Sequence, residues 1–332
     1  MTCARLLFRR CVRWLPALAL GFPLGFAVTP AAAQECELSG LAQTRFIEFN
    51  SPNIATRPVS LLRIKGKLSI PTGGGKNCAL LPRRLPAVLI LHGSSGVDAR
   101  GDFHQEALNA AGIATLQIDM WEARGVTGLG NRPAAPILTY PDAFSALAWL
   151  SAHPRIDPAR IGVLGFSWGG VISLASAEHL YAGLFGGGLR FAAHVAHYPV
   201  CYGANNVDIP ALFPPATAGT QFLNLTGAPV LIQIGSEDDY DNGTARCVSL
   251  AAAVNPSNNG VVSVAEYPGA FHAWDRLMIP VTALDPFANE GSFFSTGQVP
   301  TVRIVPSVKQ ALQARQRALA FFMQHLGVMA GR

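Results

Sequence analysis

The most constraining feature of this 332-residue chain is the pattern Gly-x-Ser-x-Gly at residues 165–169. The largely apolar residues 161–164 are typical of the end of a buried strand, and the small residues 169–177 are typical of a packed helix. A sharp strand-to-helix turn leaves room only for hydrogen at both flanking positions and lifts the serine hydroxyl out of the sheet. The next backbone N–H then lies at a helix N-terminus, where it can hold an oxyanion. The pattern predicts a nucleophile at Ser167, with a structural glycine-rich turn as the alternative.

Residues 1–33 have the pattern of a secretory signal peptide. Four arginines near the start precede an apolar segment at 15–28 that two prolines interrupt, and Ala-Ala-Ala at 31–33 offers a cleavage site. A membrane anchor is the weaker interpretation, because the apolar run is short and broken. We therefore expect residues 34–332 to be exported to the periplasm or secreted, without a membrane anchor after cleavage.

The basic character of the whole chain comes mainly from this leader. The sequence has 25 Lys+Arg and 20 Asp+Glu, and four of the arginines lie in residues 1–33, so the mature chain has 21 basic and 20 acidic residues. A net charge of +1 gives no indication of nucleic-acid binding.

Strand-like and helix-like segments alternate along the mature chain, which predicts an α/β fold with a doubly wound parallel sheet. The expected strands are residues 59–70, 87–91, 113–118, 161–164, 191–198, 229–234 and 261–267. The expected helices are residues 103–111, 141–152, 169–177, 244–254 and 306–328. Residues 34–332 form a single expected domain, with an irregular N-terminal extension at 34–58 and a long surface connection at 276–304.

A serine nucleophile needs a base, and on such a sheet the order along the chain is nucleophile, acid, histidine. His272 follows the last expected strand and is the predicted base, whereas His325 lies near the end of a terminal helix and is a surface or packing residue. Asp238, just beyond the strand at 229–234, is the predicted acid, and its neighbour Asp239 is the alternative.

An oxyanion hole requires two N–H donors. Trp168 follows the nucleophile, and the loop after the strand at 87–91 supplies the second donor in such folds. We expect Ser94 N–H to fill that role, with Ser95 as the alternative. His92 is interpreted as a structural support for this loop.

Large side chains near these strand ends are candidates for substrate contact. We expect a shallow pocket lined by Trp121, Trp168, Tyr198 and Trp274. Arg124 is a candidate partner for a substrate carboxylate, because a guanidinium binds a carboxylate through two parallel hydrogen bonds. A salt bridge within its own loop is an equal alternative for Arg124.

Four cysteines remain after the leader is removed, an even number that favours two disulfides in an exported protein. Cys201 and Cys247 follow neighbouring expected strands and are predicted to pair, which leaves Cys36 with Cys78. The cysteines and histidines have no metal-ligand spacing, so we expect neither a metal nor another cofactor.

Four motifs together resemble the dienelactone hydrolase family of α/β-hydrolases. They are Gly-Phe-Ser-Trp-Gly-Gly from 165, Tyr-Pro-x-Cys from 198, Gly-x-x-Asp-Asp from 235, and Tyr-Pro-Gly-Ala-x-His from 267. The resemblance implies a mostly parallel eight-stranded sheet flanked by helices, no large cap domain, and hydrolysis of small esters or lactones. It also supports Asp238 as the acid. The founding members of the family use a cysteine where this chain has Ser167.

The sequence thus predicts an exported serine hydrolase that cleaves carboxylic esters or lactones of small molecules through an acyl-enzyme. A serine peptidase or amidase on the same fold is one alternative, and a non-catalytic binding protein that retains the fold is another. The sequence leaves the oligomeric state open.

Overall fold

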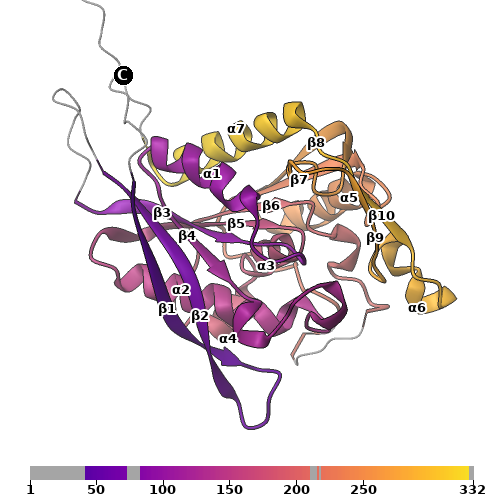
Figure 1. The fold of residues 1–332 in the computed structure, drawn as a ribbon, viewed down its shortest axis with the longest axis horizontal. Helices are drawn as coiled ribbons and strands as arrows, with labels where there is room; N and C mark the ends of the chain where they lie inside the picture. Colours follow the sequence, from indigo (N-terminus) through magenta and orange to yellow (C-terminus); the bar gives the residue numbers. More distant parts are fainter. Residues whose placement is uncertain (1–41, 73–82, 210–214, 217, 329–332) are drawn as a thin grey trace, which may run out of the picture. The chain divides into compact units, whose positions relative to one another are not determined.

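The fold is built on an eight-stranded sheet with the strand order β1-β2-β4-β3-β5-β6-β7-β8 (Figure 1). This description comes from a computed structural model and covers residues 42–72, 83–209, 215–216 and 218–328. The strands of the sheet are β1 (Ala42–Asn53), β2 (Ser60–Pro71), β3 (Leu85–Leu91), β4 (Ala114–Asp119), β5 (Ile156–Phe166), β6 (Ala193–His197), β7 (Val230–Glu237) and β8 (Val262–Phe271).

The six strands from β4 to β8 in this order pair in parallel, whereas β2 is antiparallel to both β1 and β4. All residues of β3 are buried, as expected for a central strand covered on both faces. The expectation of a mostly parallel eight-stranded sheet is therefore confirmed.

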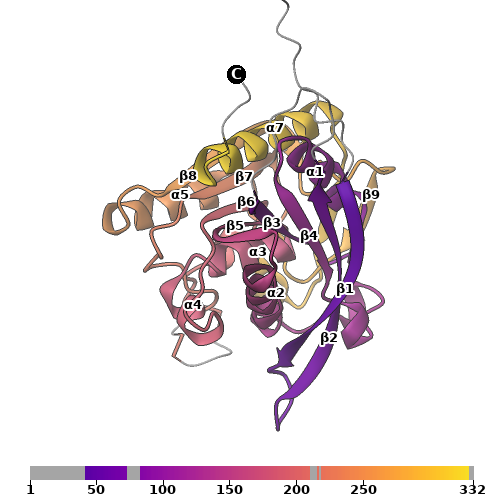
Figure 2. The same ribbon diagram turned by 90° about the vertical axis from the view of Figure 1, so that its left-hand side faces the viewer.

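Helices cover both faces of the sheet. The α-helices are α1 (Ala99–Ala110), α2 (Tyr140–Ala152), α3 (Trp168–Ala175), α4 (His179–Phe185), α5 (Ala245–Val254), α6 (Phe293–Thr296) and α7 (Val308–His325). In both views α1 and α7 lie on one face, and α2, α3 and α4 lie on the other (Figures 1 and 2). Short 3₁₀ turns complete the described elements: η1 (Glu122–Arg124), η2 (Leu129–Asn131), η3 (Pro136–Thr139), η4 (Cys201–Gly203), η5 (Asn255–Ser257) and η6 (Asn289–Gly291).

Local sequence explains where two of these helices lie. Asp98 caps α1, because its carboxylate accepts a hydrogen bond from the Arg100 N–H. The buried residues of α7 recur at helical spacing and are mostly alanine, which lets the helix approach the sheet closely: Ala311, Ala314, Ala318 and Phe322. The five helices predicted from the sequence are all present, and α4 and α6 are additions to them.

One expectation about an irregular segment is wrong, and a second expectation is incomplete. Part of the supposed extension at 34–58 is β1, a polar edge strand that pairs with β2 along its whole length. Its side chains are mostly exposed, so the sequence lacks the apolar alternation of a half-buried strand. The supposed surface connection at 276–304 contains a two-stranded antiparallel sheet of β9 (Val281–Leu284) and β10 (Thr301–Ile304).

The parallel arrangement determines where side chains can meet. The carboxyl ends of parallel strands lie along one edge of the sheet, and a ligand site of an open α/β fold forms beyond that edge. The loops after β3, β5, β7 and β8 begin at His92, Ser167, Asp238 and His272. Within the described residues, no helix has the length and apolar character needed to cross a bilayer.

Candidate active site

Ser167 lies at the tip of the turn between β5 and α3. Its φ is 50°, a left-handed value that only the surrounding structure can impose on a residue with a side chain. A Cβ on Gly165 would lie 1.9 Å from the Gly169 carbonyl oxygen, and a Cβ on Gly169 would lie 2.4 Å from the Leu91 carbonyl oxygen. Both glycines are therefore needed for close backbone approach, as the Gly-x-Ser-x-Gly pattern predicts.

His272 and Asp238 reach Ser167 from the loops after β8 and β7. His272 Nε2 lies 2.9 Å from Ser167 Oγ, and His272 Nδ1 lies 2.7 Å from Asp238 Oδ2. Because an ionised carboxylate only accepts hydrogen bonds, His272 Nδ1 carries the proton and Nε2 is free to take one from the serine hydroxyl. All three side chains are buried. The structure thus brings together the three residues that the sequence order selected.

The two candidate acids face different ways. Asp238 Oδ1 accepts hydrogen bonds from the backbone N–H groups of Tyr240 and Asp241, which directs Oδ2 toward His272. Asp239 instead forms an ion pair with Arg303, with 2.7 Å between its Oδ1 and Nη2 of the arginine. The geometry therefore favours Asp238 over Asp239 as the partner of His272.

The two residues predicted to donate to the oxyanion, Ser94 and Trp168, line the cavity that Ser167 lines. Trp168 is the first residue of α3, so its N–H has no acceptor within the helix. Ser95, the alternative to Ser94, is exposed and does not line this cavity.

The loop that carries Ser94 is held from behind by two aromatic side chains. His92 Nδ1 donates to the Gly93 carbonyl, and its Nε2 accepts from the Met120 N–H. Burial lowers the pKa of His92 to about 4, which keeps the ring neutral for this pair of contacts. Trp121 Nε1 donates to the Ser94 carbonyl at 3.1 Å.

A cavity of about 120 Å³ opens beside Ser167. It is smaller than the roughly 300–1,000 Å³ of pockets for drug-sized ligands. Its wall is mainly apolar and combines residues from several loops and helices, including Ile137, Trp168, Leu174, Val200, Ile209 and Phe287.

Of the four aromatic residues expected in the pocket, only Trp168 lines it. Tyr198 is fully buried behind the His272 ring, and its hydroxyl donates to Asp275 and accepts from Arg100. Trp274 is also fully buried and packs against aromatic rings of the core. Trp121 supports the Ser94 loop, as described above. The expectation that Trp121, Tyr198 and Trp274 contact substrate therefore has to be corrected.

The expectation that Arg124 binds a substrate carboxylate is also wrong. Its two terminal nitrogens donate to the buried Asp142 carboxylate, at 2.6 Å for Nη1 and 3.2 Å for Nη2. Asp142 in turn accepts from the Ser51 hydroxyl of β1. Arg124 lies outside the cavity beside Ser167 and forms a structural salt bridge, although its partner belongs to α2 rather than, as the alternative expected, to the loop of Arg124.

A different arginine, which sequence reasoning missed, does line the cavity. Arg132 binds Asp285 through two hydrogen bonds of 2.8 and 2.7 Å. Asp285 comes from the 276–304 segment, so this supposed connection also helps to form the pocket. The two residues are 153 positions apart, and no local pattern in the sequence signals their contact.

A disulfide joins the turn η4, which follows β6, to helix α5. Cys201 and Cys247 are bonded, with a Cα–Cα distance of 5.1 Å, as the sequence predicts. The buried Asp241 carboxylate accepts from the backbone N–H groups of Cys201 and Tyr202, which ties the loop after β6 to the loop after β7. Cys36 and Cys78, and the leader at 1–33, lie outside the described residues, as does their predicted pairing.

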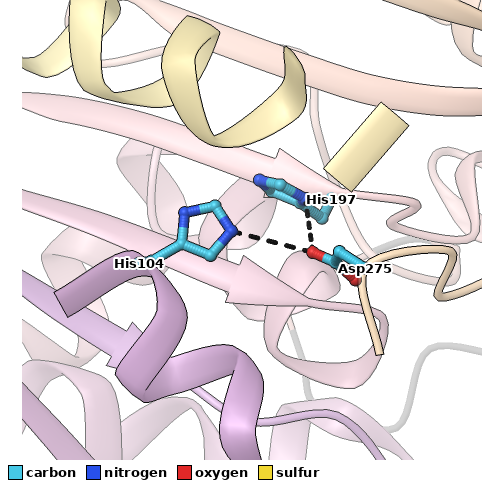
Figure 3. Close-up of side chains that lie close together, drawn as sticks. All are labelled: His104, His197 and Asp275. Atoms are coloured by element: carbon cyan, nitrogen blue, oxygen red, sulfur yellow. Dashed lines mark ion pairs between the residues drawn. The ribbon is translucent and has the colours of Figure 1, made fainter. Parts of the chain in front are cut away.

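A second cluster of titratable groups is buried in the fold (Figure 3). It consists of His104 from α1, His197 from β6, and Asp275, three residues after His272. Asp275 Oδ2 lies 3.3 Å from His197 Nδ1 and 3.7 Å from His104 Nε2, and neither contact has hydrogen-bond geometry. The facing atoms lie within 4.8 Å of one another, a spacing at which three residues could ligate a metal ion.

Hydrogen bonding around His197 argues against a metal at this cluster. Gln233 Nε2 donates to the Ala314 carbonyl and also points at His197 Nε2, 2.9 Å away. Gln233 Oε1 accepts from the Tyr267 hydroxyl, which fixes the orientation of the amide. His197 Nε2 must then accept, so Nδ1 carries the proton and faces Asp275 as a donor rather than as a ligand. The other candidate group, Cys201, Asp241 and Cys247, contains the disulfide and lacks free thiolates.

A comparison with known protein families places the chain in one of them. Residues 80–277 match the model of the Dienelactone hydrolase family. No curated protein matches the chain significantly.

Solved structures share the fold at low sequence identity. A putative dienelactone hydrolase from Klebsiella pneumoniae subsp. pneumoniae MGH 78578 is 18% identical, with a TM-score of 0.52, over 85% of this chain and 99% of its own. Thermogutta terrifontis esterase 2, phosphoramylated by tabun, is 16% identical, with a TM-score of 0.55, over 86% of this chain and 97% of its own. An esterase from Pyrobaculum calidifontis is 17% identical, with a TM-score of 0.53, over 86% of both chains.

Proposed function

The chain belongs to the dienelactone hydrolase family and is a hydrolase of ester bonds, and from that premise we propose that it is an exported serine enzyme. Its substrates are small carboxylic esters or lactones, which it cleaves through an acyl-enzyme. The observation that carries the proposal is the continuous contact from Asp238 through His272 to Ser167, with the serine opening on an apolar cavity.

In the acylation half of the reaction, Ser167 Oγ attacks the substrate carbonyl carbon while its proton moves to His272 Nε2. The negative charge that forms on the carbonyl oxygen is stabilised by the N–H groups of Ser94 and Trp168. The tetrahedral intermediate then collapses, the C–O bond of the ester breaks, and His272 Nε2 gives its proton to the departing alkoxide. For a lactone, the alkoxide stays attached to the acyl group.

In the deacylation half, water attacks the acyl carbon of the Ser167 ester and loses its proton to His272 Nε2. The same two N–H groups stabilise the second oxyanion, and Ser167 leaves with the proton from His272. Asp238 stays ionised throughout and stabilises the imidazolium that forms in each half.

Turnover of 4-nitrophenyl butyrate tests the proposal, because nitrophenol release requires only ester cleavage. We expect hydrolysis that is lost in Ser167→Ala, and a preference for the butyrate over the palmitate ester at matched soluble concentrations, since the cavity is small. A correctly folded wild-type chain without turnover of any short ester would contradict the proposal. Equal turnover of the matching 4-nitroanilide would favour the amidase alternative.

Export is supported by the sequence of residues 1–33 and fits the disulfide between Cys201 and Cys247, since such bonds persist in oxidising compartments. The test is N-terminal sequencing of the protein from periplasm and medium. A mature start at Gln34 is expected, and an uncleaved cytoplasmic chain would contradict export.

A further inference from the structure

The cavity beside Ser167 has one charged pair in its wall, among the described residues. Arg132 and Asp285 are the charged side chains that line it, and they face each other with exposed fractions of 7% and 1%. The remaining lining residues are apolar or carry a hydroxyl.

The positive charge of Arg132 is balanced by the carboxylate of Asp285. Both of its terminal nitrogens donate to Asp285, in the same two-bond geometry with which an arginine would bind a substrate carboxylate. The guanidinium lies over the rings of Trp168 and Phe287, at 5.7 and 5.1 Å from their centroids. Asp285 also accepts from the Tyr240 hydroxyl and the Phe287 N–H. The pair is therefore held from several sides and is electrically neutral as a unit.

The lining hydroxyls are engaged as well. Tyr240 donates to Asp285, Tyr202 donates to the Phe287 carbonyl, and Thr220 shares a hydrogen bond with Tyr140. Apart from Ser94 and Ser167 at the reaction centre, the hydroxyls of the described wall thus have partners inside the protein.

We propose that this site takes neutral esters or lactones with a small apolar group and rejects substrates that carry a carboxylate near the reacting carbonyl. The inference rests on the proposed function and names its substrate class. A carboxylate that enters the cavity loses its hydration and finds, among the described lining residues outside the reaction centre, no unpaired cation or free side-chain donor, which is unfavourable. An alkyl group in the same place gains from leaving water.

Diethyl succinate tests this within one reaction, because the first hydrolysis converts a neutral diester into the monoethyl succinate anion. Alkali uptake at constant pH 7.5 counts the acids released. We expect fast uptake of one equivalent and a second equivalent with kcat/KM at least 100-fold lower. Uptake of two equivalents with comparable kcat/KM, after allowing for the two ester groups of the diester, would overturn the inference.

Asp285→Asn sharpens the test, because it leaves Arg132 unpaired in the cavity wall. In this variant we expect the ratio of kcat/KM for the diester over the monoester to fall at least tenfold. Asp142→Asn is the matched control: it releases Arg124 from an equally close pair that lies outside the cavity, so the ratio is expected to stay unchanged. A ratio unchanged in a folded Asp285→Asn protein would contradict the role assigned to this pair, and if that variant does not fold, the wild-type measurement decides.

Failure of the proposed function gives a different result. A folded wild-type protein that hydrolyses neither succinate ester nor 4-nitrophenyl butyrate contradicts ester hydrolysis at Ser167. Ligand-observed NMR on Ser167→Ala then tests the charge preference without turnover. Stronger binding of diethyl succinate than of monoethyl succinate supports the inference, and equal or reversed binding overturns it.

Discussion

Two buried carboxylates, Asp238 and Asp275, each face an imidazole Nδ1, and only the imidazole beside Asp238 also contacts a serine hydroxyl next to a cavity. Asp238 lies 2.7 Å from His272, and Asp275 lies 3.3 Å from His197. His272 Nε2 faces Ser167, which lines the cavity. His197 Nε2 faces the amide of Gln233, which hydrogen bonds to the Ala314 carbonyl and the Tyr267 hydroxyl hold in place.

The difference indicates what the proposed catalytic pair has in addition to an Asp–His contact. In Asp238–His272, which we call the reactive pair, the acceptor nitrogen faces the Ser167 hydroxyl beside the cavity. In Asp275–His197, which we call the sealed pair, the acceptor nitrogen faces the side-chain amide of Gln233. Burial raises the pKa of Asp275, but contacts with His104 and His197 and the charge of Arg100 outweigh burial and hold that pKa well below its usual range.

The sealed pair also lies where it can hold the reactive one in position. Asp275 follows His272 by three residues, and Ala273 between them has a left-handed φ of 54°. Asp275 accepts from the hydroxyl of Tyr198, whose ring packs against the ring of His272. We therefore expect the reactive pair to control turnover and the sealed pair to control mainly stability.

The largest predicted effect is the loss of turnover when Ser167 or His272 is replaced. Ser167→Ala and His272→Ala are each expected to lower kcat by about 10⁴-fold or more, because the triad acts as a unit. Turnover of 4-nitrophenyl butyrate measures this, with circular dichroism and urea unfolding as checks of the fold. Ser173→Ala, on the same helix α3, is the control and is expected to keep kcat within a few-fold. Residual kcat within tenfold of wild type in Ser167→Ala would contradict the assignment of the nucleophile.

The next effect concerns the choice of acid. Asp238→Asn is expected to lower kcat by about 10³–10⁴-fold, since an amide favours the wrong tautomer of His272. Asp239→Asn removes an exposed ion pair with Arg303, and its expected change in kcat is less than threefold. Parallel measurements on the two variants decide the assignment, and a larger loss in Asp239→Asn would reverse it.

Asp275→Asn tests the sealed pair. We expect the free energy of unfolding to fall by about 3–5 kcal/mol, because the substitution leaves groups buried without their charged partner. The expected loss in kcat is about tenfold or less, through a looser His272 loop. Urea unfolding and kcat are measured on the same preparation. A variant with unchanged stability and a thousandfold loss of kcat would place Asp275 in the catalytic machinery instead.

The smallest effect is a change in the pH dependence of stability. Burial lowers the pKa of His104 to about 4, whereas an unfolded histidine titrates near 6.5. As the pH falls from about 6.5 to 4, the unfolded chain therefore binds a proton that the folded chain does not, and stability decreases.

His104→Asn removes this contribution, so we expect the slope of the unfolding free energy between pH 6.5 and 4.5 to become shallower by about 1 kcal/mol per pH unit. Exposed His179→Asn is the control for replacing one histidine by asparagine. An identical slope in His104→Asn and wild type would show that His104 is not kept neutral by burial.

The sequence predicts the parts of this structure that local patterns determine. Continuous apolar runs mark the central strands, and the flanking glycines mark the turn at Ser167, because each depends on residues close together in the chain. The order of Ser167, Asp238 and His272 follows from the order of strand ends along one sheet edge. The edge strand β1 is not predicted in this way, because most of its side chains are exposed and it lacks an apolar run.

Pocket residues are harder to predict, since they depend on contacts between distant segments. Arg124 and Arg132 both follow β4, and only their distant partners, Asp142 and Asp285, determine which one reaches the cavity. Tyr198 precedes Pro199, which lines the pocket, yet the Tyr198 hydroxyl donates a hydrogen bond to Asp275 in the core. No spacing in the sequence encodes these choices.

The most direct test of the central claim is to trap the acyl-enzyme. The protein is mixed with 4-nitrophenyl butyrate, quenched in acid within the first turnover, and analysed by intact-mass and peptide mass spectrometry. We predict one butyryl group per chain on the peptide that contains Ser167, and none in Ser167→Ala. Steady ester hydrolysis without an adduct on Ser167, or with the acyl group on another residue, would contradict the account.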